Sequence, residues 1–255
     1  MVLFSSTAVP CPSPLFTSHT DKADPELSRI QTVADNSSSS GLVPKTQERG
    51  PLSHRVLHIQ GPDISKTYIQ AGVSMTEHRR RLDKGKGRET DPLPLGVELG
   101  WIGMHIKRLG RRDLAFEVGV LDGRGREGAI RISSFKVRSR SMLLTGRLIE
   151  QETPTIHFDR AIPLLHLPLN LPARSTSTMT PWLHISFDIN TLIPLFERLP
   201  RRRPEVGLAG QGKRRKTTTG LPSGKLGSIT YVRIYANCRV RRIWFVSSLI
   251  RQRCR

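Results

Sequence analysis

Cysteine is scarce in this sequence of 255 residues. The three thiols, Cys11, Cys238 and Cys254, are an odd number and include no CxxC pair. This pattern indicates neither a disulfide framework nor a zinc knuckle, and it favours a reducing compartment. His54 and His58 lie four residues apart, but no third ligand lies near them in the sequence, so we expect ordinary histidines there. The sequence therefore predicts no metal site and no cofactor.

Long apolar stretches are also missing. No segment approaches the roughly 20 apolar residues that a membrane span needs. The first residues, MVLFSSTAVPCPSPLF, lack a basic region and are interrupted by prolines, which makes them a poor secretory signal. We therefore expect a soluble, intracellular protein without a membrane partner.

Acidic side chains are few, because 21 Asp and Glu residues face 41 Lys and Arg residues, which leaves a net charge of +20. The net charge is −1 over residues 1–54, +7 over 55–200 and +14 over 201–255. A field of this sign attracts polyanions such as nucleic acid or an acidic protein surface. Two dense clusters are the candidate polyanion-binding residues: Arg201, Arg202, Arg203, Lys213, Arg214, Arg215 and Lys216.

The segment that carries these clusters is rich in Pro and Gly. Short basic runs of this kind are typical of a nuclear import signal or of an arm that binds nucleic acid, and equally of a solvated loop with no partner. Apolar residues make up 36% of the chain, which is lean, so much of its length is expected to lie outside the core. We expect disordered insertions at 21–53, 72–94, 140–160 and 200–228.

Apolar and polar residues alternate in most of the remaining chain. Residues 114–135 place apolar side chains on one face, turn at Asp122-Gly123 and return with two isoleucines, as a β-hairpin does. Residues 55–70 contain a second hairpin pattern around a Gly-Pro-Asp turn. Residues 183–189 alternate like a strand with one wet face. Many short strands of this kind predict an antiparallel sandwich or barrel.

Helical spacing is confined to 190–199, where Asn190 is the expected cap and Pro194 falls near the start of the helix. The prediction is therefore an all-β fold with one short helix. We expect a single domain over 54–250, interrupted by the insertions.

Two glycine-rich motifs resemble nucleotide-binding loops. GRGREG at 123–128 follows a predicted strand, but another strand follows it where a dinucleotide site needs a helix, so we expect a hairpin tip. GLAGQGKR at 207–214 has Arg214 where a phosphate-binding loop needs Ser or Thr, and no apolar strand precedes it. Without a catalytic constellation in the sequence, we expect a protein that is not an enzyme and has no small-molecule substrate.

The stretch ITYVRIYANCRVRRIWF, 229–245, predicts two strands around a turn at Ala236-Asn237, because Asn adopts a left-handed conformation readily. Cys238 and Val240 share a face that Ile243 rejoins only if one extra residue is accommodated at 241–242, which predicts a β-bulge. The bulge would direct both arginines to solvent or to a carboxylate. We favour pairing with acidic residues of the same fold over contact with a partner.

Assembled in order, these segments resemble the domain of the cilia- and flagella-associated protein 20 family. LGVELGWIGMHIKRL (95–109), VLHIQGPDISKTYI (56–69) and PWLHISFDI (181–189) are similar to its central strands, its hairpin and its Trp-containing strand. Residues 1–20 are a candidate remnant of the first strand of that domain. The most specific match, ANCRVRR, is the family fingerprint: Ala236, Asn237, Cys238, Arg239, Val240, Arg241 and Arg242.

The resemblance implies a jelly-roll β-sandwich, similar in architecture to carbohydrate-binding modules. It also implies a non-catalytic structural protein that binds tubulin or other axonemal proteins at the inner junction of ciliary doublet microtubules, consistent with a basic chain. The alternative is a nuclear or nucleic-acid-associated protein that uses residues 201–216. Carbohydrate binding rests on fold analogy alone. We expect Trp101, Trp182 and Trp244 to pack in or near the core, which leaves few aromatics for sugar.

Overall fold

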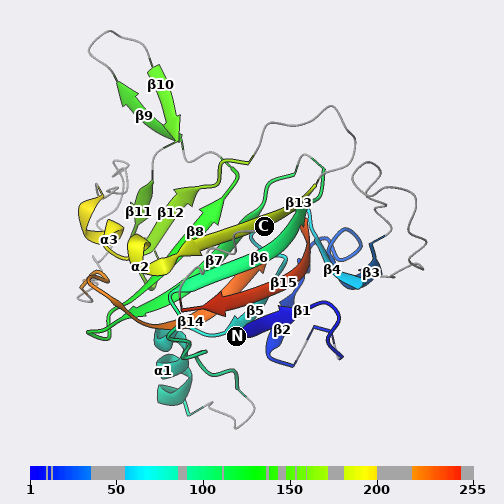
Figure 1. Cartoon of the computed structure of the whole chain (residues 1–255), viewed down its shortest axis with the longest axis horizontal. Helices are drawn as coiled ribbons and strands as arrows, with labels where there is room; N and C mark the ends of the chain where they lie inside the picture. The colour runs from blue at the N-terminus through cyan, green and yellow to red at the C-terminus, as the bar shows by residue number, and fades with distance from the viewer. Residues whose placement is uncertain are drawn as a thin grey trace, which may run out of the picture.

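Two β-sheets packed face to face form the body of the protein, with the apolar core between them (Figure 1). In the view of Figure 1, strands β13, β6 and β15 lie in front of strands of the second sheet. The predicted all-β sandwich is therefore confirmed. The computed structural model describes residues 1–9, 11–12, 14–35, 55–85, 91–110, 112–135, 138–142, 148–152, 154–158, 160–171, 181–199 and 220–247.

Sheet A contains six strands, all paired antiparallel. β15 lies in its middle, beside β6 along its whole length, and β1 and β4 share its other edge. The N-terminal residues thus belong to the sandwich. The order of the strands across sheet A is β13 (Trp182–Asp188), β6 (Trp101–Arg108), β15 (Cys238–Val246), β4 (Arg55–Gln60) and β3 (Arg29–Ala34), with β1 (Val2–Ser5) beside β15.

Sheet B contains seven strands in the order β11 (Thr155–His157), β12 (Leu164–Pro168), β8 (Glu127–Ser133), β7 (Ala115–Asp122), β14 (Leu226–Tyr235), β5 (Tyr68–Gly72) and β2 (Phe16–His19). Its pairs are antiparallel except β12 with β8, which run parallel. The sheet is therefore mixed where the sequence predicted only antiparallel pairing. Between β8 and β11 the chain forms a hairpin, β9 (Arg138–Met142) with β10 (Leu148–Glu152), that projects from the sandwich in Figure 1.

The core follows from the period of two along each strand. From sheet A, Ile102, Met104 and Ile106 of β6 are fully buried, and from sheet B, Phe116 and Val118 of β7 are fully buried. Each such side chain contributes roughly 1.5–3 kcal/mol relative to an exposed one. The residues between them point to the outer faces of the sandwich, and these outer faces carry the polar chemistry.

The hairpin predicted at 114–135 is confirmed. β7 and β8 pair antiparallel, and GRGREG forms the turn and the start of β8, as expected for a hairpin tip. The hairpin predicted at 55–70 is wrong, because β4 pairs within sheet A and β5 within sheet B, so the Gly-Pro-Asp turn connects the two sheets.

The predicted turn at Ala236-Asn237 joins β14 to β15, and Asn237 has φ of 117°. The two strands do not form a hairpin, because β14 pairs within sheet B and β15 within sheet A. The register of β15 against β6 shifts between Val240 and Arg242, so the predicted bulge contains Arg241.

Several segments predicted to be disordered contain regular structure. The helix α1 (Met75–Asp83) lies within 72–94, β3 lies within 21–53, and β10, β11 and the start of β14 fall in the other two segments. The prediction was wrong at these elements because the segments contain few apolar residues, so their contacts with the rest of the chain left no sign in the sequence. The Ser74 hydroxyl caps α1, and the Glu127 carboxylate accepts from the backbone N–H groups of Met75 and Thr76.

The predicted helix at 190–199 is present as two short helices, α2 (Ile189–Leu192) and α3 (Leu195–Arg198). The cap of the first is Asp188 rather than Asn190, because the Asp188 carboxylate accepts from the Asn190 backbone N–H. Pro194 stands at the N-cap of α3 and separates the two helices, since it has no N–H to continue the first. Among the described residues, no helix is long and apolar enough to cross a membrane.

Candidate binding faces

The outer face of sheet A is aromatic and basic. Side chains that alternate with the core residues of β6, β13 and β15 bring tryptophans, histidines and cations onto one surface. This surface is called the sheet A face, and it consists of Trp101, His105, Lys107, Trp182, His184, Arg239, Arg241, Arg242 and Trp244, with Asp35 at its border.

The tryptophans differ from the prediction that they pack in or near the core. All three are half-buried on the outer side of sheet A. The ring of Trp244 lies against Gly103, where a β-carbon would meet the indole at 2.4 Å. His105 and His184 stand edge-on to this indole, with ring centroids 4.9 and 5.2 Å away. Alternation along β6, β13 and β15 places these residues opposite the core positions, whereas the prediction rested on general burial tendencies.

Asp35 gathers the cations of the sheet A face. Its carboxylate lies 3.1 Å from an Arg239 nitrogen, 3.4 Å from Arg241 and 3.9 Å from Lys107, and the Trp182 indole N–H donates to it at 2.8 Å. The Arg241 guanidinium also stacks on the Trp182 ring at 4.5 Å. The predicted pairing of the bulge arginines with an acid of the same fold is confirmed for Arg241, and Arg239 pairs with the same carboxylate.

The charge of this cluster is not balanced, since one carboxylate faces three cations. Burial lowers the pKa of Lys107 against the attraction of Asp35, and the neighbouring charges of Arg239 and Arg241 lower it further. Arg242, directed outward by the bulge, is exposed. The sheet A face therefore keeps a positive surplus that an anionic partner would neutralise.

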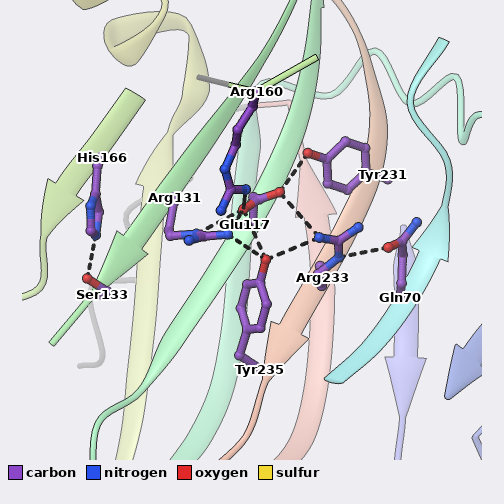
Figure 2. A network of polar contacts seen from close by, with 9 residues as sticks. All are labelled: Gln70, Glu117, Arg131, Ser133, Arg160, His166, Tyr231, Arg233 and Tyr235. Atoms are coloured by element: carbon purple, nitrogen blue, oxygen red, sulfur yellow. Dashed lines mark hydrogen bonds and ion pairs between the residues drawn. The ribbon is translucent and has the colours of Figure 1, made fainter. Parts of the chain in front are cut away.

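The outer face of sheet B carries a row of polar side chains that sequence reasoning missed. Register places one residue from each of the seven strands in line, each paired with its neighbour on the next strand. Its centre is Glu117, flanked directly by Arg131 on β8 and Arg233 on β14 (Figure 2). The row, in spatial order, is Thr155, His166, Arg131, Glu117, Arg233, Gln70 and Thr17.

Glu117 is a buried carboxylate that accepts several hydrogen bonds. Its side chain is 2% exposed, and it accepts from Arg131 Nε at 2.9 Å and Nη2 at 2.5 Å. The hydroxyls of Tyr231 and Tyr235 donate to it at 2.8 and 3.1 Å. Burial by itself raises the pKa of Glu117, but Arg131, Arg233 and the Tyr231 hydroxyl outweigh it, so the pKa lies below its ordinary value. The carboxylate is therefore ionised at neutral pH.

Arg233 is enclosed by aromatic rings. Its guanidinium lies 4.6 Å from the Tyr68 ring centroid, 5.5 Å from Tyr231 and 5.8 Å from Tyr235, within the range of cation–π attraction. Its Nε donates to Gln70 at 2.7 Å. The sequence signal for this cage was the alternation of Tyr231, Arg233 and Tyr235 in one strand, but that pattern does not reveal which carboxylate lies opposite.

His166 and Ser133 form a buried pair at one end of the row, with the hydroxyl 2.6 Å from Nε2. Burial, with Arg131 and His157 nearby, lowers the pKa of His166 to about 4. Ser133 is 1% exposed, so its hydroxyl has no access to a substrate. We therefore interpret the pair as part of the scaffold of the sheet.

The other predicted site residues divide between these faces and the remaining chain. In the fingerprint, Ala236, Asn237, Cys238 and Val240 are buried in the turn between β14 and β15 and at the start of β15, and Arg239, Arg241 and Arg242 belong to the sheet A face. Burial raises the pKa of the Cys238 thiol, which makes it unreactive at neutral pH. The candidate polyanion-binding residues, 201–203 and 213–216, lie outside the described residues.

No metal cluster is present in the part of the chain that the structure describes. His58, half-buried on β4, contacts Gln60 at 3.1 Å, and His54 lies outside the described ranges. No protein-family model matches the sequence, and no curated protein matches it.

Proposed function

We propose that the protein is a non-catalytic binding protein that docks on an acidic protein surface, such as that of a microtubule or another axonemal component, through the sheet A face. The observation that carries this proposal is the surplus of cations beside tryptophans on one face of the sandwich. Aromatic and Arg side chains are enriched in protein interfaces, and charge complementarity sets the register and speed of docking.

The resemblance of ANCRVRR and the preceding strands to the ciliary family supports the same proposal. In that case the fingerprint arginines have two duties. Arg239 and Arg241 hold the border of the face through Asp35, while Arg242 remains available to the partner. A cytoskeletal or ciliary location follows from the proposal.

The test is co-sedimentation with polymerised tubulin. The variant Arg242→Glu reverses one exposed charge on the face, and Arg124→Glu makes the same charge change in the exposed β7–β8 turn. At about 50 mM salt we expect R242E to weaken binding roughly tenfold, because a like charge against an acidic partner is repelled, and R124E to change it less than about twofold. Absence of pelleting of the unmodified protein, or equal loss in both variants, would refute the proposal.

Nucleic acid is the second candidate partner. The sheet A face combines cations with half-buried tryptophans, an arrangement that also suits stacked single-stranded bases. The basic residues 201–216 would contribute phosphate contacts. Binding to single-stranded RNA that falls steeply with salt, and less steeply once these arginines and lysines are neutralised, would favour this function over tubulin binding.

A further inference from the structure

Three arginines surround the single carboxylate of Glu117. Besides Arg131, the terminal nitrogens of Arg160 and Arg233 lie 3.5 and 3.7 Å from its oxygens. Arg160 comes from the connection between β11 and β12, and in Figure 2 it approaches Glu117 from the side opposite Tyr235. One negative charge facing three positive ones leaves a local surplus of two.

A small cavity opens beside these arginines. It measures about 150 Å³ and is lined by residues that include Arg160, Arg233, Gln70 and Tyr231. Its volume is several times the roughly 30 Å³ that one water molecule occupies in the liquid, so it has room for a carboxylate or phosphate group. Glu77 also lines the cavity, but its carboxylate is paired with Arg81 at 2.5 Å.

The hydrogen bonds of the network leave donors for a ligand. Glu117 accepts hydrogen bonds from Arg131 and the two tyrosines, as described above. Arg160 is 41% exposed, and its described contact uses one terminal nitrogen, whereas a guanidinium offers five N–H donors. Arg233 spends its Nε on Gln70 and its Nη1 on Tyr235. A group that accepts hydrogen bonds and carries negative charge therefore fits this cavity.

We propose that the cavity between Arg160 and Arg233 is an anion-binding subsite that takes one carboxylate or phosphate group. Arg160 is its solvent-facing side, and Arg233, enclosed by its aromatic cage, is its buried side. Guanidinium groups bind planar or tetrahedral oxyanions with two parallel hydrogen bonds, which a lone Lys would not provide. The subsite lies on sheet B, so it does not depend on the function proposed for the sheet A face.

The ligand chemistry has two sources, a free phosphate or an acidic side chain of a protein. The probes are therefore inorganic phosphate and a hexaglutamate peptide, each titrated at constant ionic strength and followed by calorimetry and by the rise in melting temperature. Saturable binding of phosphate alone identifies a free anion as the ligand. Binding of the peptide alone, or of both in competition, identifies an acidic side chain as an acceptable ligand. Saturable binding of neither probe overturns the proposal.

Three variants locate the binding. Arg160→Gln is expected to lower the affinity for the probe about tenfold or more, because it removes one charged partner. Arg160→Lys should lower the affinity less, because the charge stays while the paired N–H donors of the guanidinium are lost. Arg124→Gln, with the same charge change in the exposed β7–β8 turn, is expected to change it less than about twofold. Equal weakening in R160Q and R124Q would show attraction by net charge and would overturn the subsite. Because the subsite lies on sheet B, we expect R160Q to pellet with tubulin as the unmodified protein does. The failure of one proposal can therefore be distinguished from the failure of the other.

Discussion

Replacing Glu117 by Gln tests whether the polar row of sheet B is held by charge. The side chain is 2% exposed, and the substitution leaves Arg131 and Arg233 without their buried counter-charge. Breaking a buried ion pair from one side costs about 3–5 kcal/mol. We expect Glu117→Gln to lie near the lower end, at about 3 kcal/mol, because the amide oxygen still accepts from Arg131 while the amide nitrogen faces the Tyr231 hydroxyl, which can turn to accept.

The stability that Glu117 contributes should depend on pH in one direction only. Because the pKa of Glu117 is lower in the folded protein than in the unfolded chain, its stabilising contribution is complete above the unfolded value of about 4.3. It is lost as the pH falls through the folded pKa, where the carboxylate takes up a proton. The difference in stability between wild type and E117Q should therefore be constant from about pH 5 to 7 and shrink below about pH 4.3.

The assay is urea unfolding at several pH values, with the free energy of unfolding extrapolated to water. The matched control is Glu26→Gln, an exposed glutamate, for which we expect a change within about 0.5 kcal/mol. A cost below about 1 kcal/mol for E117Q, or a cost that does not diminish in acid, would show that packing of the tyrosines rather than the ionised carboxylate holds the row.

Two further predictions concern stability. Burial lowers the pKa of His166 to about 4, so the neutral ring is favoured in the folded state and stability falls as the pH drops from the unfolded value of about 6.5 towards 4. This loss amounts to roughly 3 kcal/mol and should be missing from His166→Gln in urea unfolding at the same pH values, whereas an equally steep fall in that variant would contradict it. Asn237→Ala should cost about 2–3 kcal/mol and Asn237→Gly about 1, because φ is 117° and both lose the bonds from the Gly61 N–H and Arg112. Thermal melts that rank the two variants in the opposite order would refute the role of the backbone conformation.

The turn and the bulge between β14 and the end of β15 show what local pattern can predict. The interruption of alternation after Val240 predicted the bulge, and the one residue suited to a left-handed turn predicted Asn237, and both are present. These features depend on neighbours within a few residues, so they are visible in sequence. The helix at Met75–Asp83 was missed because its caps come partly from Glu127, more than 40 residues away, while its own residues are polar.

The sequence by itself determined the strand pattern, the two facing sets of core residues and the strong positive charge. Period two states which residues of a strand share a face, but it does not state which strands become neighbours. Only the tertiary structure decided that Glu117 lies between Arg131 and Arg233, and that Asp35 meets Arg239 and Arg241. The order of strands follows from packing the whole chain around one core, so contacts between distant strands, and the candidate sites made of them, emerge at that level.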